Sequence, residues 1–192
     1  SFQSMGTITR TKIGQPYNGF FGYRRLGIFQ NQQQIEAYTN KNGALIQPNA
    51  RPGDFMWADL NNDGQINDLD RTFLGSNLPK YTFGLTINLD YKGFDFTAFA
   101  QGVAGNKIFQ GLRRLDILTS NYSTEALSRW HGEGTSNDFP RLTDSDPNGN
   151  FSKMSDFYLE NGDYIRFKVV QLGYTLPNKL FRGTGISRLR VF

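Results

Sequence analysis

The chain of 192 residues has no cysteine, one histidine and no long run of apolar residues. Without cysteine it has no disulfide scaffold, no thiolate-bound metal and no cysteine nucleophile. No stretch approaches the roughly 18 consecutive apolar residues that a membrane-spanning helix needs. The net charge is only +4 and there is no basic run, so the charge does not indicate a nucleic-acid partner.

An initiator methionine and a signal peptide are also absent, and residues 189–192 have the composition of a strand interior. We therefore expect a segment cut at both ends from a longer protein. Aromatic residues make up 15% of the chain, which is too many for a disordered tail. The segment should be ordered, with its apolar residues spread along alternating positions.

Residues 81–91 alternate strictly: every odd position is large and apolar, and every even position is polar or small. Only a strand converts a period of two into two faces of opposite character. The pair Lys92-Gly93 predicts a tight turn, and a second alternating run covers 94–103. Together these runs predict a β-hairpin.

A third run, 164–175, changes parity in its middle, because its apolar residues are odd-numbered up to Val169 and even-numbered from Val170. A slip of one residue turns every later side chain to the other face unless an extra residue is absorbed. We therefore predict a β-bulge at Val169-Val170. Further strands are expected near 7–29 and at 188–192.

The connections alternate in length, with long loops expected at 31–78 and 111–162 and short turns between the other strands. All long loops would then lie at one end of an up-and-down sheet, which is typical of an outer-membrane barrel. A soluble β-sandwich, with the apolar face as its core, also fits the alternation. The uneven loops favour an all-β fold of antiparallel up-and-down strands forming part of a transmembrane β-barrel.

One loop, residues 59–70, has the ligand spacing of a calcium site. Hard cations such as Ca²⁺ take six to eight oxygens, and this spacing wraps a loop around them. The expected ligands of a structural ion are Asp59, Asn61, Asp63, Gln65 through its carbonyl, and Asp70. The alternative is an Asx-rich turn that caps a short helix at 69–74 without any metal.

No residue pattern indicates catalysis, so we expect no enzyme. His131 lies in a polar loop, where a lone histidine is usually a surface residue. No pair of carboxylates is placed by the sequence at glycosidase separation. Substrate-binding residues are not identified by the sequence.

Several stretches, taken in order, resemble the C-terminal barrel region of the SusC/RagA family of TonB-linked outer-membrane transporters. They are 14–23, 27–30, 47–48, 51–54, 59–64 with 70–71, 91–95, 101–106, 129–130, 140–141, 163–168 and 172–177. The resemblance covers nearly the whole chain.

The resemblance implies a Gram-negative outer-membrane protein with a barrel of about 22 strands closed by a plug. Such a protein imports glycan oligosaccharides or peptides with energy from TonB, under a SusD-like surface lipoprotein that acts as a lid. The plug and the TonB-contacting segment would lie outside this chain. The odd-numbered residues of 81–91 would face membrane lipid, and Thr82, Thr86, Asn88 and Asp90 would face the lumen.

Two other functions are weighed beside this one. The first is a soluble secreted β-rich calcium-binding or carbohydrate-binding module, because the loop at 59–70 resembles a dockerin loop. Dockerins carry two such repeats with flanking helices, and this chain has one between β-runs. The second is a carbohydrate-active β-enzyme, for which no catalytic pair is found.

Overall fold

The structure is a computed structural model that describes residues 2–5, 8–117, 119, 121–183 and 185–192. The chain divides into two compact units. The core unit comprises residues 1–78 and 107–161, and the sheet unit comprises 79–106 and 162–192. No helix in the described ranges is long and apolar enough to cross a bilayer.

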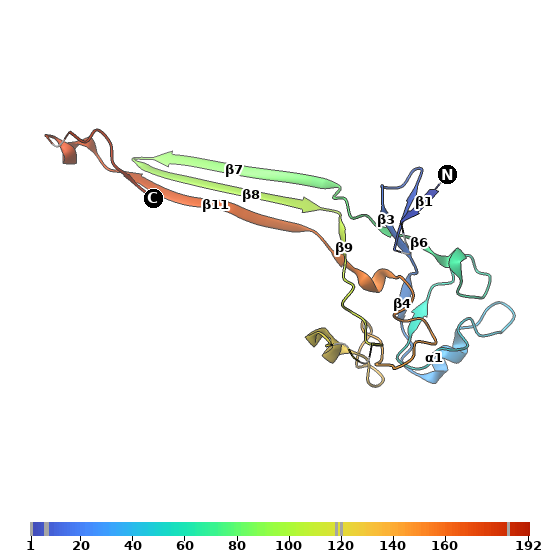
Figure 1. Cartoon of the computed structure of the whole chain (residues 1–192). Coiled ribbons are helices and arrows are strands. Elements are labelled where there is room, and N and C mark those ends of the chain that lie inside the picture. The colour runs from blue at the N-terminus through green and yellow to red at the C-terminus, as the bar shows by residue number, and fades with distance from the viewer. Residues whose placement is uncertain (1, 6–7, 118, 120, 184) are drawn as a thin grey trace. The chain divides into compact units, whose positions relative to one another are not determined.

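The sheet unit is one antiparallel sheet of four strands (Figure 1). Its strands are β7 (Tyr81–Tyr91), β8 (Phe94–Ala104), β11 (Tyr164–Thr175) and β12 (Arg190–Val191), and a 3₁₀ turn, η4 (Asn178–Phe181), precedes β12. The spatial order β7-β8-β11-β12 follows the chain, which confirms the predicted up-and-down arrangement. The hairpin turn at Lys92-Gly93 has positive φ at both residues, +48° and +88°, as a two-residue turn requires.

The core unit contains the remaining elements. Its strands are β1 (Phe2–Met5), β2 (Thr9–Lys12), β3 (Gly19–Gly22), β4 (Arg25–Ile28), β5 (Phe55–Trp57), β6 (Thr72–Gly75), β9 (Lys107–Phe109) and β10 (Leu159–Asn161). Its helical elements are α1 (Gln32–Ala37), η1 (Asp68–Asp70), η2 (Thr124–Ser128) and η3 (Asp156–Tyr158). These strands form three small sheets with the orders β1-β2-β3-β6, β4-β5 and β9-β10.

The region expected to be extended near 7–29 is therefore divided between two sheets of the core unit. Glycine allows part of this packing, because a Cβ on Gly22 would lie 2.2 Å from the Met154 carbonyl oxygen. The stretches 31–78 and 111–162, expected to be long loops, carry short strands and helical turns and belong to the same compact unit.

An aromatic cluster forms the centre of the core unit. Phe157 is 1% exposed, and its ring centroid lies 5.1 Å from those of Phe55 and Phe139. Phe55 also packs edge-on against Trp57 at 5.3 Å. These rings come from both long connections, so their burial removes apolar surface from water only when 31–78 and 111–162 fold together.

Buried polar side chains bind the open edge of β5, whose other edge pairs with β4. Asn150 Oδ1 accepts from the Phe55 N–H at 3.0 Å, and Asn148 Nδ2 donates to the Phe55 carbonyl at 2.9 Å. Gln47 Oε1 accepts from the Trp57 N–H at 2.8 Å. Side chains thus replace a neighbouring strand and satisfy backbone groups that would be costly to bury unpaired.

The same network contains a buried ion pair. Asp54 is fully buried, and its Oδ1 accepts from Arg141 Nε at 2.7 Å and from Asn150 Nδ2 at 2.8 Å. Asp54 Oδ2 accepts from the Arg51 N–H at 2.9 Å. Since Arg141 is 87 residues from Asp54 in sequence, the pair also joins the two long connections.

We predict that Asn150→Ala loosens β5, because the buried Phe55 N–H loses its acceptor at a cost of about 1–3 kcal/mol. In the full-length protein in detergent, hydrogen exchange of peptides covering 54–58 should become about tenfold faster. Asn42→Ala, at an exposed position of the same residue type, should leave this exchange unchanged. Unaltered protection of β5 in Asn150→Ala would contradict the role given to Asn150.

Candidate functional site

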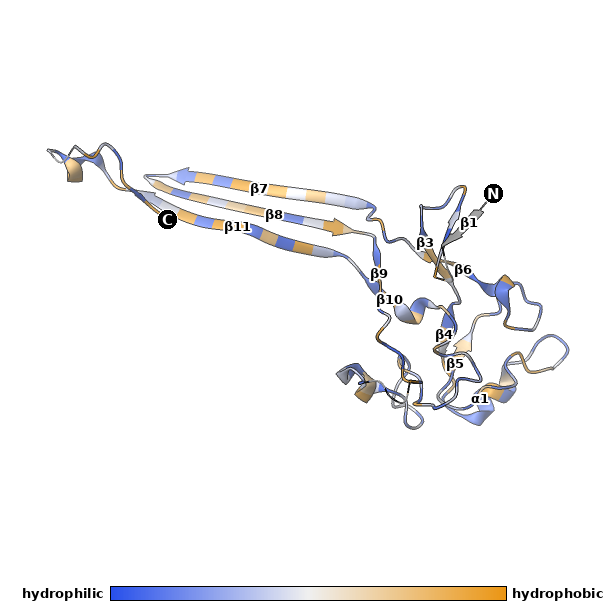
Figure 2. Ribbon diagram, in the orientation of Figure 1, coloured by the Kyte–Doolittle hydropathy of each residue, from blue (hydrophilic) through white to orange (hydrophobic). Residues whose placement is uncertain are grey.

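The sheet unit has one continuous apolar face. Paired residues of neighbouring strands lie on the same side of a sheet, and the register pairs apolar with apolar or small residues along three strands. The apolar face consists of the odd-numbered residues of β7, the even-numbered residues of β8, and Ile165, Phe167, Val170, Leu172 and Tyr174 of β11. Figure 2 shows the resulting alternation of hydropathy along β7 and β11.

The large side chains of this face are exposed. In β7 the exposed fraction ranges from 41% for Ile87 to 69% for Tyr81, with Leu85 at 59%. In a sandwich the same residues would be core, whereas a lipid-facing surface requires them to be open. The exposed face therefore favours the barrel over the sandwich.

Small residues in the central strand allow the larger ones on either side to pack. Ala98 and Ala100 of β8 are 7% and 6% exposed, although their partners Ile87 and Leu85 are open. A Cβ on Gly102 would lie 2.6 Å from the Phe83 ring. The middle of the face is thus filled by side chains that lean in from the neighbouring strand.

A β-bulge keeps β11 in phase with this face. The register shifts between Phe167 and Val169, which leaves Lys168 as the extra residue. The bulge therefore lies slightly earlier than Val169-Val170, where we expected it, because Val169 still pairs with Phe99 on the polar side. Its consequence is the predicted one, since Val170, Leu172 and Tyr174 join Phe167 on the apolar face.

The opposite, polar face carries hydrogen-bonding groups. Thr97 Oγ1 donates to Asn88 Oδ1 at 3.1 Å across the hairpin. Arg190 of β12 forms a two-point ion pair with Asp95 of β8, with Nε–Oδ1 at 2.9 Å. Gly173 of β11 lies between them, and a Cβ there would come within 2.7 Å of both side chains. The ion pair therefore spans three strands because the middle one has glycine.

The loop 59–70, expected to bind calcium, is closed by its own hydrogen bonds. Asp70 is fully buried, with Oδ1 accepting from the Leu60 N–H at 2.8 Å and Oδ2 from the Asn67 N–H at 2.8 Å. Asn67 and Asp70 form a capping box on η1. The turn is one 3₁₀ turn followed by β6, so the helix considered at 69–74 does not form.

Of the other expected ligands, Asn61, Asp63 and Gln65 are exposed and Asp59 is half-buried. Asp63 accepts from the side chains of Asn61 and Asn67 at 2.8 and 2.9 Å, and these bonds lower the pKa of its carboxyl group. Gln65 donates its N–H to Asp63. Asp59 Oδ2 accepts from the Gly64 N–H at 2.8 Å, while Asp59 Oδ1 is buried without a hydrogen-bond partner in the structure.

Across the described ranges, no group of three or more His, Cys, Asp or Glu side chains is arranged to hold a metal ion. His131 is exposed, and its Nδ1 lies 3.0 Å from the Arg129 carbonyl oxygen. Neither the loop 59–70 nor His131 is part of a catalytic group of side chains among the described residues. The Asp95–Arg190 pair was not expected from the sequence, where its only signal was Gly173, a glycine between Gln171 and Thr175 on the polar face of β11.

No protein-family model matches the chain. It is 28% identical over 93% of its length to TonB-dependent receptor P3 of Formosa agariphila, and 23% identical over 91% to TonB-dependent receptor SusC of Bacteroides thetaiotaomicron. The whole chain superposes on the RagAB peptide importer in its closed-closed state with a TM-score of 0.65 and 22% identity.

Over more than nine-tenths of its length the chain is similar to TonB-dependent receptors, SusC among them. It spans 17% of the Formosa receptor, 15% of SusC and 21% of the matched RagAB chain. The match to the RagAB chain shows the fold, in which the sheet unit is part of a transmembrane β-barrel. In such a barrel the apolar face meets lipid and the polar face meets the lumen.

We predict that Leu85→Arg impairs membrane assembly of the full-length protein and that Thr86→Arg does not. An arginine on the lipid side near mid-depth costs about 2–4 kcal/mol, whereas the lumen side accepts charge. The measurement is the fraction of heat-modifiable folded protein on a gel of outer membranes. Equal loss in both variants would contradict the assignment of the faces.

Proposed function

We propose that the protein containing this segment imports glycan oligosaccharides or peptides across the outer membrane of a Gram-negative cell. The observation that carries the proposal is the sheet with one exposed apolar face and one polar face, in a chain related to TonB-dependent receptors. The related RagAB structure is described as a peptide importer, which supports peptides as one substrate class.

The proposed partners follow from the same relationship. TonB would supply energy through a part of the protein outside this segment, and a SusD-like surface lipoprotein would assist in substrate capture. The similarity to SusC and to the RagAB peptide importer supports such a lipoprotein partner. The soluble-module alternative is disfavoured, because water would face the exposed apolar side chains of β7.

Uptake by intact cells tests the transport proposal. Disruption of the gene should abolish uptake of either fluorescent oligopeptides or fluorescent oligosaccharides, and a protonophore should abolish the same uptake in the parent strain. A plasmid that carries the Thr86→Arg variant should restore uptake to the disrupted strain. Unchanged uptake of both classes after disruption, or recovery of the protein in a soluble fraction, would refute the proposal.

The partner is tested by purification. The tagged full-length protein, extracted from cells grown with radioactive palmitate, should co-purify with a labelled lipoprotein. Absence of a labelled band from a correctly folded preparation would refute the lipoprotein partner.

We also propose a weak structural Ca²⁺ site at the loop 59–70. The support is the buried Asp59 Oδ1, since a buried carboxylate oxygen without a donor is stabilised by a cation. Asp70 already uses both oxygens for backbone N–H groups. The ion would therefore be bound by Asp59, Asn61, Asp63, the Gln65 carbonyl and water. So few protein ligands fit a dissociation constant of about 10⁻⁴–10⁻³ M.

Calcium at several times this dissociation constant should slow hydrogen exchange of peptides covering 60–70. An ion that binds only the folded loop stabilises the folded loop. The effect should disappear in Asp63→Ala and persist in Asp144→Ala, where an exposed aspartate outside the loop is removed. Equal exchange rates in calcium and in EDTA would contradict the calcium site and show that the loop is held by its hydrogen bonds alone.

A further inference from the structure

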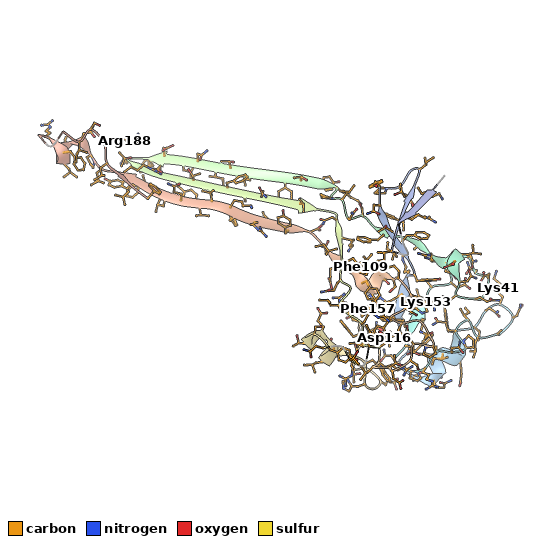
Figure 3. All side chains as sticks on the ribbon, viewed as in Figure 1. Lys41, Phe109, Asp116, Lys153, Phe157 and Arg188 are labelled. Atoms are coloured by element: carbon orange, nitrogen blue, oxygen red, sulfur yellow. The ribbon has the colours of Figure 1, made fainter. Side chains whose placement is uncertain are left out.

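The core unit contains a cavity of about 440 Å³ that the transport proposal does not use. Its walls come from distant segments, with Tyr23 after β3, Arg71 after η1, Phe109 in β9, and Lys153. Phe109 and Lys153 are labelled in Figure 3. The volume is within the usual range for sites that take small ligands.

Aromatic rings form one side of this cavity. Tyr23, Phe151 and Tyr158 are each less than 9% exposed, and Phe109, at 37%, is more open. The Phe109 and Tyr158 ring centroids lie 5.5 Å apart. The buried rings hold this wall in place, and the more open Phe109 offers a surface on which an apolar group can pack.

Some charged groups of the cavity wall have a partner of opposite charge and one does not. Asp68 accepts from the Tyr23 hydroxyl at 3.2 Å and lies 3.8 Å from Arg71, and Arg114 is paired with Asp116. Lys153 forms no ion pair with any residue that the structure describes. It is the cation of this wall that lacks a carboxylate partner.

Lys153 is also partly removed from water. Its Nζ donates to the Asn148 carbonyl at 2.9 Å, and burial lowers the pKa of its amine, with Asp146 acting in the opposite direction. A half-buried ammonium gains more from an anion than an exposed one does, because less water competes for it. The cavity therefore joins an unpaired cation to an aromatic wall.

We propose that this cavity binds a carboxylate carried next to an aromatic or apolar group, with the carboxylate on Lys153 and the group against Phe109 and Tyr158. Peptide ends and acidic sugars can both present a carboxylate in this way. The proposal concerns binding alone and holds whether or not the whole protein transports the ligand.

Hippurate and hippuramide test the proposal, since they differ only in the carboxylate. Calorimetry on the full-length protein in detergent should show hippurate binding at least about tenfold tighter, as expected for one charge-assisted hydrogen bond. Equal affinities of hippurate and hippuramide would overturn the proposal for a peptide-like ligand. This comparison uses the unaltered protein and so does not depend on the folding of any variant.

Variants then locate the binding. Lys153→Met should weaken hippurate binding about tenfold, Lys153→Arg should keep it within about threefold, and Lys41→Met, at an exposed lysine far along the chain, should not change it. Unchanged affinity in a folded Lys153→Met protein would overturn the site.

Galacturonate distinguishes the two sources of the carboxylate. Tighter binding of hippurate than of galacturonate would support a peptide-like ligand, and the reverse would support an acidic sugar. If neither hippurate nor galacturonate binds, or if their binding does not depend on Lys153, the proposal is overturned.

Discussion

A side chain in an extended strand can face only one of two sides, and the sheet of β7, β8 and β11 depends on that constraint. Within a bilayer the backbone must be fully paired, so the side chains alone decide which surface meets lipid. The register matches apolar residues across all three strands, and the unpaired Lys168 restores the match where β11 changes parity. Without that extra residue Val170, Leu172 and Tyr174 would point to the polar side.

The core unit is held together differently. Its strands are short, and the far edge of β5 is bound by the side chains of Gln47, Asn148 and Asn150 instead of by another strand. Each of these bonds to β5 lies in a buried environment, where an unmade hydrogen bond is most costly. Together with the Phe157 cluster, this network folds two long connections into one body that can present a cavity.

The sequence predicted the long strands and not the core unit, for a physical reason. Alternation in 81–91 and 164–175 is local, so it could be recognised without knowing the partners. The parity change showed that β11 contains an extra residue, but both Lys168 and Val169 satisfied it. The bond from Phe55 to Asn150 joins residues 95 apart, and no local pattern announces it. In the loop 59–70, spacing predicted Asp70 as the carboxylate ligand that completes a calcium site. Spacing did not show that its oxygens accept backbone N–H groups.

Accessibility of neighbouring positions of β7 to lipid and to water tests the assignment of the faces most directly. Since this segment has no cysteine of its own, spin labels can be attached at Ile87→Cys and Asn88→Cys in the reconstituted full-length protein. The account predicts that the label at 87 is relaxed mainly by oxygen dissolved in the bilayer and the label at 88 mainly by a water-soluble nickel complex. The same response at both positions, or the reverse order, would contradict it.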